Sequence, residues 1–450
     1  MKKDNLNKTI YFILLIVIAI FIYYKLFNKN TEIIDNPTPS TTTISINNIY
    51  IDKENIIMAS GANDILKITI EPSNANLDQI IIESSNPSVA TISNNGEIKA
   101  LNKGNATIKV RSIDGTKEKT CEIKVIETIV FDQRNIAIID YLNNDSSEKM
   151  INTYKQYNCS KENCMKPQKY LSSINDQINV YKYNIDNNTK ELLVTTNNNE
   201  INDYLYPNNT YYLESLNNND DIEIVKITGN VRIPDVPKLK NIRDLGGWNA
   251  DGGTVKYGRL FRSERPDSDA SVLINNLMIN KVVDLREKDQ VEKSGTSSSL
   301  NNFRKIITTL NYSTDKSGHS RDAVLEIMES IVNNQNVLFH CQVGRDRTGT
   351  IAYLLEGILG VPLNNRHIDY ELSYLALGER TRTFGNYNNL INKINAFNMT
   401  NYEQERFINW FLSFSTNKEQ DLNLINNFRK VMIDGNPHIY KIENDTLVLD

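Results

Sequence analysis

The sequence has few of the residues that hold metal ions. In 450 residues it contains only four cysteines and four histidines. The histidines are scattered, at His319, His340, His367 and His438. No group of cysteines and histidines has the ligand spacing of a zinc site. We therefore predict no structural metal.

The chain also lacks a strong excess of charge of either sign. It has 50 Lys and Arg against 55 Asp and Glu, a formal net charge of −5 at pH 7. This mild acidity argues against a nucleic-acid-binding protein and leaves any basic site local. The length is too great for one ordinary core, so about two to four domains are expected.

Only one long apolar run is present, at residues 10–27, where Lys25 is the single charge. It is slightly short for a spanning helix of about 20 residues, but Tyr24 and Lys25 can reach the interface. No small-residue cleavage site and no cysteine follows it, which disfavours a cleaved signal peptide and a lipoprotein. We expect residues 1–30 to be a single-pass membrane anchor. The secretion-type modules that follow favour an extracellular location for the rest of the chain.

Two β-rich segments are predicted beyond the anchor. The Pro/Thr/Ser-rich residues 31–43 indicate an extended linker. Residues 44–127 alternate apolar and polar side chains in short runs separated by turns, which predicts a β-sandwich. Residues 84–92, 96–101 and 103–108 resemble the bacterial immunoglobulin-like group 2 domain. That resemblance implies a surface spacer, with an adhesive role as the less favoured alternative.

The second segment, residues 128–232, is less distinctive. Its alternating runs predict strands, and residues 211–214 weakly resemble a fibronectin type III-like module. Cys159 and Cys164 are close enough in sequence for a small-loop disulfide, and two free thiols remain an equal alternative. Cys121, in a strand of the preceding segment, is expected to be a buried apolar residue.

The chemistry is concentrated near residue 341. Residues 337–339 predict a short buried strand, a turn containing Gly344 follows, and residues 350–359 predict a helix. In this order, backbone N–H groups converge on an anion and the helix dipole adds positive potential. We therefore expect the loop residues Gln342, Val343, Gly344 and Arg345 to bind phosphate.

Cys341 opens this loop and Arg347 closes it. The surrounding amides favour the thiolate form of the cysteine. The planar fork of Arg347 can bind two phosphate oxygens at once. Thr348 can donate a hydrogen bond to the thiolate and help it leave in a second step. These parts predict a thiolate nucleophile directed at phosphorus.

The order His-Cys, five residues, Arg, Thr resembles the signature of the protein-tyrosine phosphatase superfamily. Together with residues 241–247 (NIRDLGG) and 258–263, it is similar to a bacterial tyrosine phosphatase family that acts on phosphotyrosine, other phosphoamino acids and phosphoinositides. Ile242 stands where that family has Phe, and Arg345 where it has Lys, which leaves substrate preference open. A buried cysteine in an ordinary turn and a rhodanese-type sulfur carrier fit less well.

Four further charged residues are expected to be structural. Asp284 and Arg286, at the end of a predicted strand, are interpreted as an ion pair, and Arg243 and Asp244 are interpreted in the same way. His340 is expected to hold the loop by a hydrogen bond.

The leaving oxygen needs a proton, so a general acid is required. Asp346, inside the loop, is the first candidate. Asp315, on an upstream loop, is the second, although a solvated loop charge explains it as well.

The sequence thus predicts a transmembrane helix, β-sandwich immunoglobulin-like domains and a C-terminal α/β cysteine-phosphatase domain at residues 233–450. The predicted activity is hydrolysis of phosphotyrosine, with dual specificity open, through a phosphocysteine intermediate and without a cofactor. A phosphoinositide or inositol-phosphate phosphatase is one alternative. A surface adhesin with a phosphate-binding module is another. The expected partners are a phosphorylated protein or phosphoinositide and the membrane, but no nucleic acid.

Overall fold

A computed structural model describes the chain from residue 44 onward, with short gaps. The described residues are 44–143, 149–159, 164–197, 199, 201, 205–266, 270–294, 298–307, 319–378 and 385–450. The predicted anchor, the predicted linker and Asp315 lie outside these ranges and stay predictions. Within the ranges, no helix combines the length and apolarity needed to cross a membrane.

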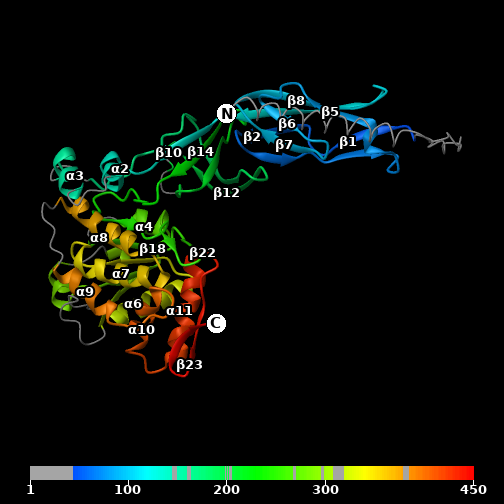
Figure 1. Ribbon diagram of the computed structural model, residues 1–450. Helices are drawn as coiled ribbons and strands as arrows, with labels where there is room; N and C mark the ends of the chain where they lie inside the picture. Colours follow the sequence, from blue (N-terminus) through cyan, green and yellow to red (C-terminus); the bar gives the residue numbers. More distant parts are fainter. Residues whose placement is uncertain are drawn as a thin grey trace, which may run out of the picture.

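The first body is the predicted β-sandwich (Figure 1). A four-stranded sheet in the order β2-β9-β8-β5 lies with a three-stranded sheet, β3-β7-β6, and a β1-β4 pair. Ile108, Cys121 and Ile123 are buried between them, as the alternation along β8 and β9 requires. The strands are β1 (Asn48–Ile51), β2 (Asn55–Ala59), β3 (Asn63–Ile65), β4 (Ile68–Glu71), β5 (Ile80–Ser84), β6 (Ala90–Ile92), β7 (Glu97–Ala100), β8 (Gly104–Ser112) and β9 (Glu118–Ile126).

The second body differs from the predicted fibronectin type III-like fold. Its described strands form one five-stranded sheet, in the order β10-β14-β13-β11-β12, whereas that fold has two packed sheets. Two helices that strand alternation did not reveal follow β10, and Cys159 and Cys164 form a disulfide after them. The elements are β10 (Thr128–Asp132), α2 (Ile136–Asn143), α3 (Lys149–Tyr157), β11 (Ile178–Asn184), β12 (Thr189–Thr196), β13 (Thr210–Ser215) and β14 (Ile222–Thr228).

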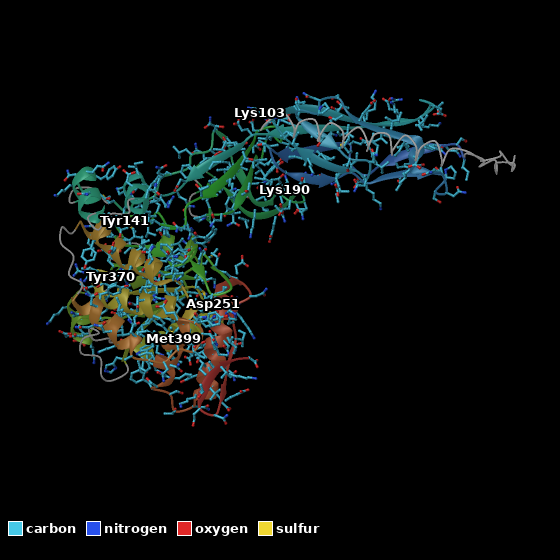
Figure 2. The ribbon with its side chains drawn as sticks, in the orientation of Figure 1. Lys103, Tyr141, Lys190, Asp251, Tyr370 and Met399 are labelled. Carbon is cyan, nitrogen blue, oxygen red and sulfur yellow. A yellow bond between two sulfur atoms is a disulfide. The ribbon has the colours of Figure 1, made fainter. Side chains whose placement is uncertain are left out.

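The helices of the second body pack on the third. Ala137, Ile138 and Tyr141 of α2 belong to the same buried cluster as the core of the C-terminal domain. The Tyr141 hydroxyl donates a hydrogen bond to the Glu371 carboxylate on α8 (Leu363–Leu377), and Figure 2 shows Tyr141 at this boundary. Helix α2 therefore shares one core with the third body, whereas the sheet of the second body has a buried cluster of its own.

The C-terminal domain is built on a sheet in the order β15-β18-β21-β19-β20, whose last four strands are parallel. Ser263, His340 and Asp284 pair at the carboxyl ends of β18, β21 and β19. Its sheet strands are β15 (Arg243–Asp244), β18 (Leu260–Ser263), β19 (Lys281–Asp284), β20 (Arg304–Ile306) and β21 (Val337–His340). Three adjacent strands thus end at one edge, where ligands bind in open α/β sheets.

Helices cover this sheet. They are α4 (Ser271–Asn275), α5 (Lys288–Ser294), α6 (His319–Val332), α7 (Asp346–Leu359), α8, α9 (Gly385–Asn395), α10 (Gln404–Leu412) and α11 (Lys418–Met432). A small three-stranded sheet is formed by β16 (Asn249–Ala250), β17 (Gly253–Val255) and β22 (Ile433–Gly435), and a separate pair by β23 (Tyr440–Glu443) and β24 (Thr446–Leu449). Helix α7 begins at Asp346, earlier than the predicted Thr350. Its first turn therefore contains Arg347 and Thr348.

Candidate active site

Cys341 lies directly beyond the end of the central strand β21. It is buried, with 2% of its surface exposed, and its thiol is free. The five-residue turn that it opens leads into the first turn of α7. The predicted order of strand, loop and helix N-terminus is confirmed.

The carbonyl groups of the loop point outward. Those of residues 341–344 each accept a hydrogen bond from a neighbouring group. In that order the donors are His340 Nδ1 at 3.0 Å, the Arg265 N–H at 3.2 Å, Asn241 Nδ2 at 3.1 Å and Arg262 Nη2 at 2.8 Å. For the N–H groups of residues 342–344, no acceptor is found in the part of the chain that the structure describes. Outward carbonyls and unpaired amides are what an anion-binding loop requires.

Gly344 cannot be replaced without moving this loop. Its φ of +74° is one that L side chains rarely adopt. A Cβ atom here would lie 2.4 Å from the Ser263 carbonyl oxygen. Glycine therefore lets the loop lie directly against the end of β18.

Arg347 is held at the edge of the sheet by α5. Its Nη1 donates to the Leu285 carbonyl at 3.3 Å and to Gln290 Oε1 at 2.9 Å. No described residue accepts from its Nε or Nη2, which leaves one side of the fork for an anion. Gln290 was not identified from the sequence, although it lies in the helix that follows the strand end at Asp284.

Thr348 carries a buried hydroxyl with no hydrogen-bond partner within the described ranges. Leaving such a group unsatisfied costs about 1–3 kcal/mol. Thr350, two residues later, donates instead to the Asp346 carbonyl at 2.9 Å. The orphaned hydroxyl fits the role proposed for Thr348, donation to the thiolate of Cys341.

Asp346, the first candidate for the general acid, already has two partners. Arg345 Nη2 lies 3.1 Å from its carboxylate, and the Tyr370 hydroxyl donates to it at 3.4 Å. The Arg345 guanidinium also lies 5.6 Å from the centre of the Tyr374 ring. The side chain of Arg345 thus contacts Asp346 and lies near Tyr374 of α8.

The predicted pair of Asp284 and Arg286 is confirmed. Arg286 Nη2 and Nε lie 2.7 and 2.9 Å from the two carboxylate oxygens, and both side chains are fully buried. Burial opposes ionisation of Asp284, but hydrogen bonds from Arg286 outweigh it and lower the pKa of this carboxyl. Burial also lowers the pKa of His340, so its ring is neutral and holds the loop as predicted.

The predicted pairing of Arg243 with Asp244 is wrong. Arg243 Nε binds Asp369 at 2.6 Å, and Asp244 binds Arg232 at 3.1 Å. Adjacent residues of a strand point to opposite faces, so the two side chains cannot meet. Each residue ties the strand to a different part of the domain.

Asp369 on α8 anchors the arginines that support the loop. Its second carboxylate oxygen binds Arg262 Nη1 at 2.5 Å, and the Nη2 of that arginine donates to the Gly344 carbonyl. Burial alone would raise the pKa of Asp369, but Arg243 and Arg262 lower it, so the carboxylate is ionised. Asp369 was not identified from the sequence, because one carboxylate among the several polar residues of α8 gives no local sign of its distant partners.

No group of three or more metal-ligating side chains occurs within the described ranges. The residues at the loop are those of an anion site.

Comparison with known proteins matches residues 234–418 to the tyrosine phosphatase family and residues 45–123 to the bacterial Ig-like domain of group 2. Both matches confirm the resemblances found in the sequence.

Individual relatives match parts of the chain. A Cupriavidus necator protein whose name assigns it to the tyrosine-protein phosphatases is 28% identical over 178 residues, covering 32% of this chain and 63% of that protein. An uncharacterised Clostridium acetobutylicum protein is 34% identical over 104 residues, covering 21% of this chain and 26% of that one. The crystal structure of P. aeruginosa TpbA matches at 17% identity with a TM-score of 0.24, covering 32% of this chain and 90% of that chain. The chain spans between 23% and 63% of the length of the curated relatives it matches.

Proposed function

We propose that the C-terminal domain, whose residues 234–418 belong to the tyrosine phosphatase family, hydrolyses phosphate monoesters with Cys341 as the nucleophile. The observation that carries this proposal is the loop itself. The carbonyls of residues 341–344 accept hydrogen bonds from outside the loop, the N–H groups of residues 342–344 have no acceptor among the described residues, and a cysteine and an arginine stand at the two ends of the loop.

The reaction has two steps. The Cys341 thiolate attacks phosphorus, the ester P–O bond breaks, and an aspartic acid gives its proton to the leaving oxygen. The loop amides and Arg347 stabilise the charge on the equatorial oxygens. Water then attacks the phosphocysteine, the S–P bond breaks, and Thr348 donates a hydrogen bond to the departing thiolate.

The general acid is Asp346 or Asp315. Asp346 lies at the end of the loop, and its carboxylate is 3.1 Å from Arg345 Nη2. General acid catalysis contributes about 10²–10⁴-fold, mostly when the leaving group is poor. Asp346→Asn and Asp315→Asn should be compared on p-nitrophenyl phosphate and on an alkyl phosphate. The general acid is the aspartate whose change lowers the rate on the alkyl phosphate more than the rate on p-nitrophenyl phosphate. A variant whose rates on the two substrates fall by the same factor has not lost the general acid.

Phosphotyrosine is the proposed substrate, supported by the family match. Phosphoinositides and inositol phosphates are the alternative, to be tried on the same protein. A purely adhesive role is less favoured because a binding module does not need an orphaned threonine beside a free thiol.

Orthovanadate, which mimics pentacoordinate phosphorus, tests the mechanism directly. We expect it to inhibit the wild-type protein and to bind much more weakly to Arg347→Ala. Full activity at saturating orthovanadate would contradict a phosphocysteine mechanism.

The proposed location is the outer face of a cell membrane, supported by the Ig-like domain and the apolar residues 10–27. A reporter fused after residue 450 tests the orientation. A cytoplasmic C-terminus would contradict it.

A further inference from the structure

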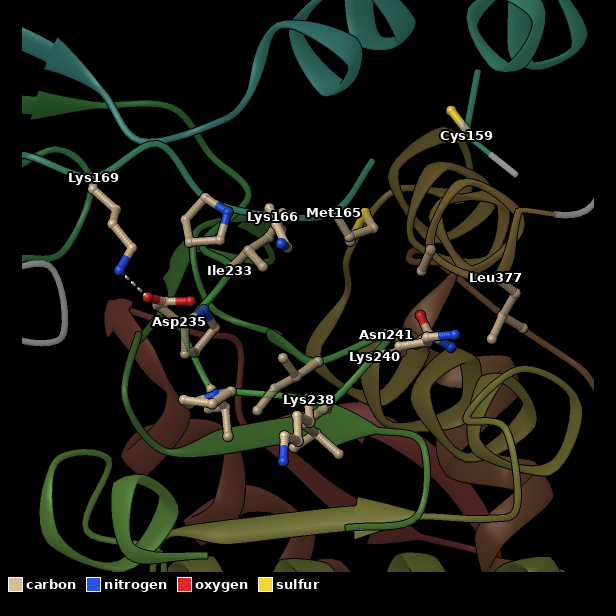
Figure 3. A pocket seen from close by; sticks show the side chains of 17 residues that line it. Cys159, Met165, Lys166, Lys169, Ile233, Asp235, Lys238, Lys240, Asn241 and Leu377 are labelled. Atoms are coloured by element: carbon tan, nitrogen blue, oxygen red, sulfur yellow. Dashed lines mark ion pairs between the residues drawn. The ribbon is translucent and has the colours of Figure 1, made fainter. Parts of the chain in front are cut away.

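A pocket of about 640 Å³ lies where the second body meets the C-terminal domain (Figure 3). Cys159 and three segments line it: residues 165–169, which follow the disulfide, residues 233–242, which lead into β15, and the end of α8 at residues 376–377. Its volume is in the range of small-molecule sites. None of the loop residues 341–347 lines it, so it is separate from the candidate active site.

The pocket is strongly basic. Four lysines line it, against a single acidic residue, Asp235. The lysines are Lys166, Lys169, Lys238 and Lys240, which Figure 3 shows coming from both sides. Such a cluster stands out in a chain whose net charge is −5, and it raises the local concentration of anions.

Three of these lysines have no ion-pair partner within the described ranges. Lys169 Nζ pairs with Asp235 at 2.9 Å. The ammonium groups of Lys166, Lys238 and Lys240 are exposed, and no carboxylate of the described residues pairs with them. Four lysines against one carboxylate leave the lining of the pocket with an excess of positive charge, which an anionic ligand would balance.

The backbone on one side of the pocket is strained. Lys238 and Asn241 have φ values of +63° and +55°, a region that non-glycine residues rarely occupy. Strain of this kind persists where the surroundings enforce it, and it concentrates at functional sites.

Asn241 connects the pocket with the catalytic loop. It is buried, its Nδ2 donates to the Val343 carbonyl, and its Oδ1 accepts from Arg243 Nη1 at 2.5 Å. The strained turn that carries Lys238 and Lys240 therefore also positions Asn241, which supports the catalytic loop.

We propose that this pocket binds a ligand with clustered phosphate groups, held by Lys166, Lys238 and Lys240. This is a second anion site, and its occupancy does not depend on hydrolysis at Cys341. The ligand is a free small molecule or the headgroup of a lipid, since both present the same chemistry.

Titration calorimetry on residues 44–450 carrying Arg347→Ala, which weakens the catalytic loop site, tests the proposal. The first probe is tripolyphosphate in solution. The second is phosphatidylcholine vesicles with and without phosphatidylinositol bisphosphate. Binding of tripolyphosphate identifies a free ligand, and binding of the phosphoinositide vesicles alone identifies a headgroup.

The triple change of Lys166, Lys238 and Lys240 to Ala should weaken binding at least tenfold. The matched control is the triple change to Ala of Lys67, Lys99 and Lys103, which are exposed lysines of the first body. This change removes the same amount of charge. It should leave binding unchanged. Absence of binding to both probes, or equal losses in the two triple variants, would overturn the proposal. Neither result depends on whether the protein hydrolyses phosphate esters.

Discussion

Individual residues outside the signature fix the shape of the catalytic loop. His340, Asn241 and Arg262 each bond a loop carbonyl, and Asp369 holds Arg262 in place. None of the four needs to touch a phosphate. They turn the carbonyls outward, and the amides are left facing the anion site.

Glu356 on α7 should make stability depend on pH. It is fully buried, neither of its carboxylate oxygens has a hydrogen-bond partner within the described ranges, and burial raises its pKa well above the usual 4.5. The folded protein therefore keeps a proton that the unfolded chain releases above pH 4.5. This stabilisation is complete below that pH and is lost as the pH rises through the folded pKa.

We expect Glu356→Gln to remove this dependence, because the amide cannot ionise. Urea unfolding followed by tryptophan fluorescence, from about pH 5 to about pH 8, should show the free energy of unfolding falling less for this variant than for the wild type. Glu329→Gln, at an exposed position of α6, is the control and should follow the wild type. Parallel curves for Glu356→Gln and wild type would show that Glu356 is ionised when folded.

The sequence could predict the residues of the loop but not those that support it. Cys341, Arg347 and Thr348 form a local pattern with fixed spacing. Asn241 lies about a hundred positions from its partner Val343, and Asp369 lies 126 from Arg243. Such pairs depend on which strands become neighbours, and no local pattern records that. The wrong pairing of Arg243 with Asp244 has the same cause, because the true partner of Arg243 is far away in the sequence.

Among the elements, the turn from β21 to α7 carries the function. The conformation of this turn depends on Gly344, because the φ of Gly344 and the closeness of Gly344 to β18 both exclude a side chain. The early start of α7 also matters, since it places Arg347 on a rigid first turn.

Gly344→Ala should therefore reduce kcat/KM by about 100-fold or more, because a shift on the order of 1 Å in a catalytic group can have that effect. Gly115→Ala is a close control, since Gly115 has φ +71° and nothing within 4 Å of the position of its Cβ. It should cost about 1–2 kcal/mol in the first body and leave kcat/KM unchanged. Normal turnover by Gly344→Ala would show that the loop tolerates displacement.

Strands were easier to predict than the helices between them. The alternation in β8 and β9 reflects one buried face and is visible in sequence. Helices α2 and α3 lie within a segment dominated by strand patterns, and α2 buries Ala137, Ile138 and Tyr141 against another domain. Their role depends on tertiary contacts, so the fold of the second body was predicted incorrectly.

In the whole molecule, the second body completes the C-terminal domain. Ile138 is fully buried in the cluster that both share, whereas Ile136 of the same helix is 54% exposed. Both tryptophans, Trp248 and Trp410, lie in the C-terminal domain, so their fluorescence reports on that domain alone.

Ile138→Ala should lower the free energy of unfolding seen by tryptophan fluorescence by about 2–5 kcal/mol. Ile136→Ala should change it by less than about 0.5 kcal/mol, as an exposed position does. An unchanged tryptophan transition in Ile138→Ala would mean that the two bodies unfold independently.

Phosphate release from a phosphotyrosyl peptide is the measurement that decides whether the protein is a phosphatase with Cys341 as its nucleophile. The protein should be residues 44–450, so that α2 and α3 still cover the C-terminal domain, beside the same protein with Cys341→Ser. We expect turnover by the wild type and none by the variant. Release that survives Cys341→Ser, or no release by the wild type from phosphotyrosine, phosphoinositides or inositol phosphates, would contradict it.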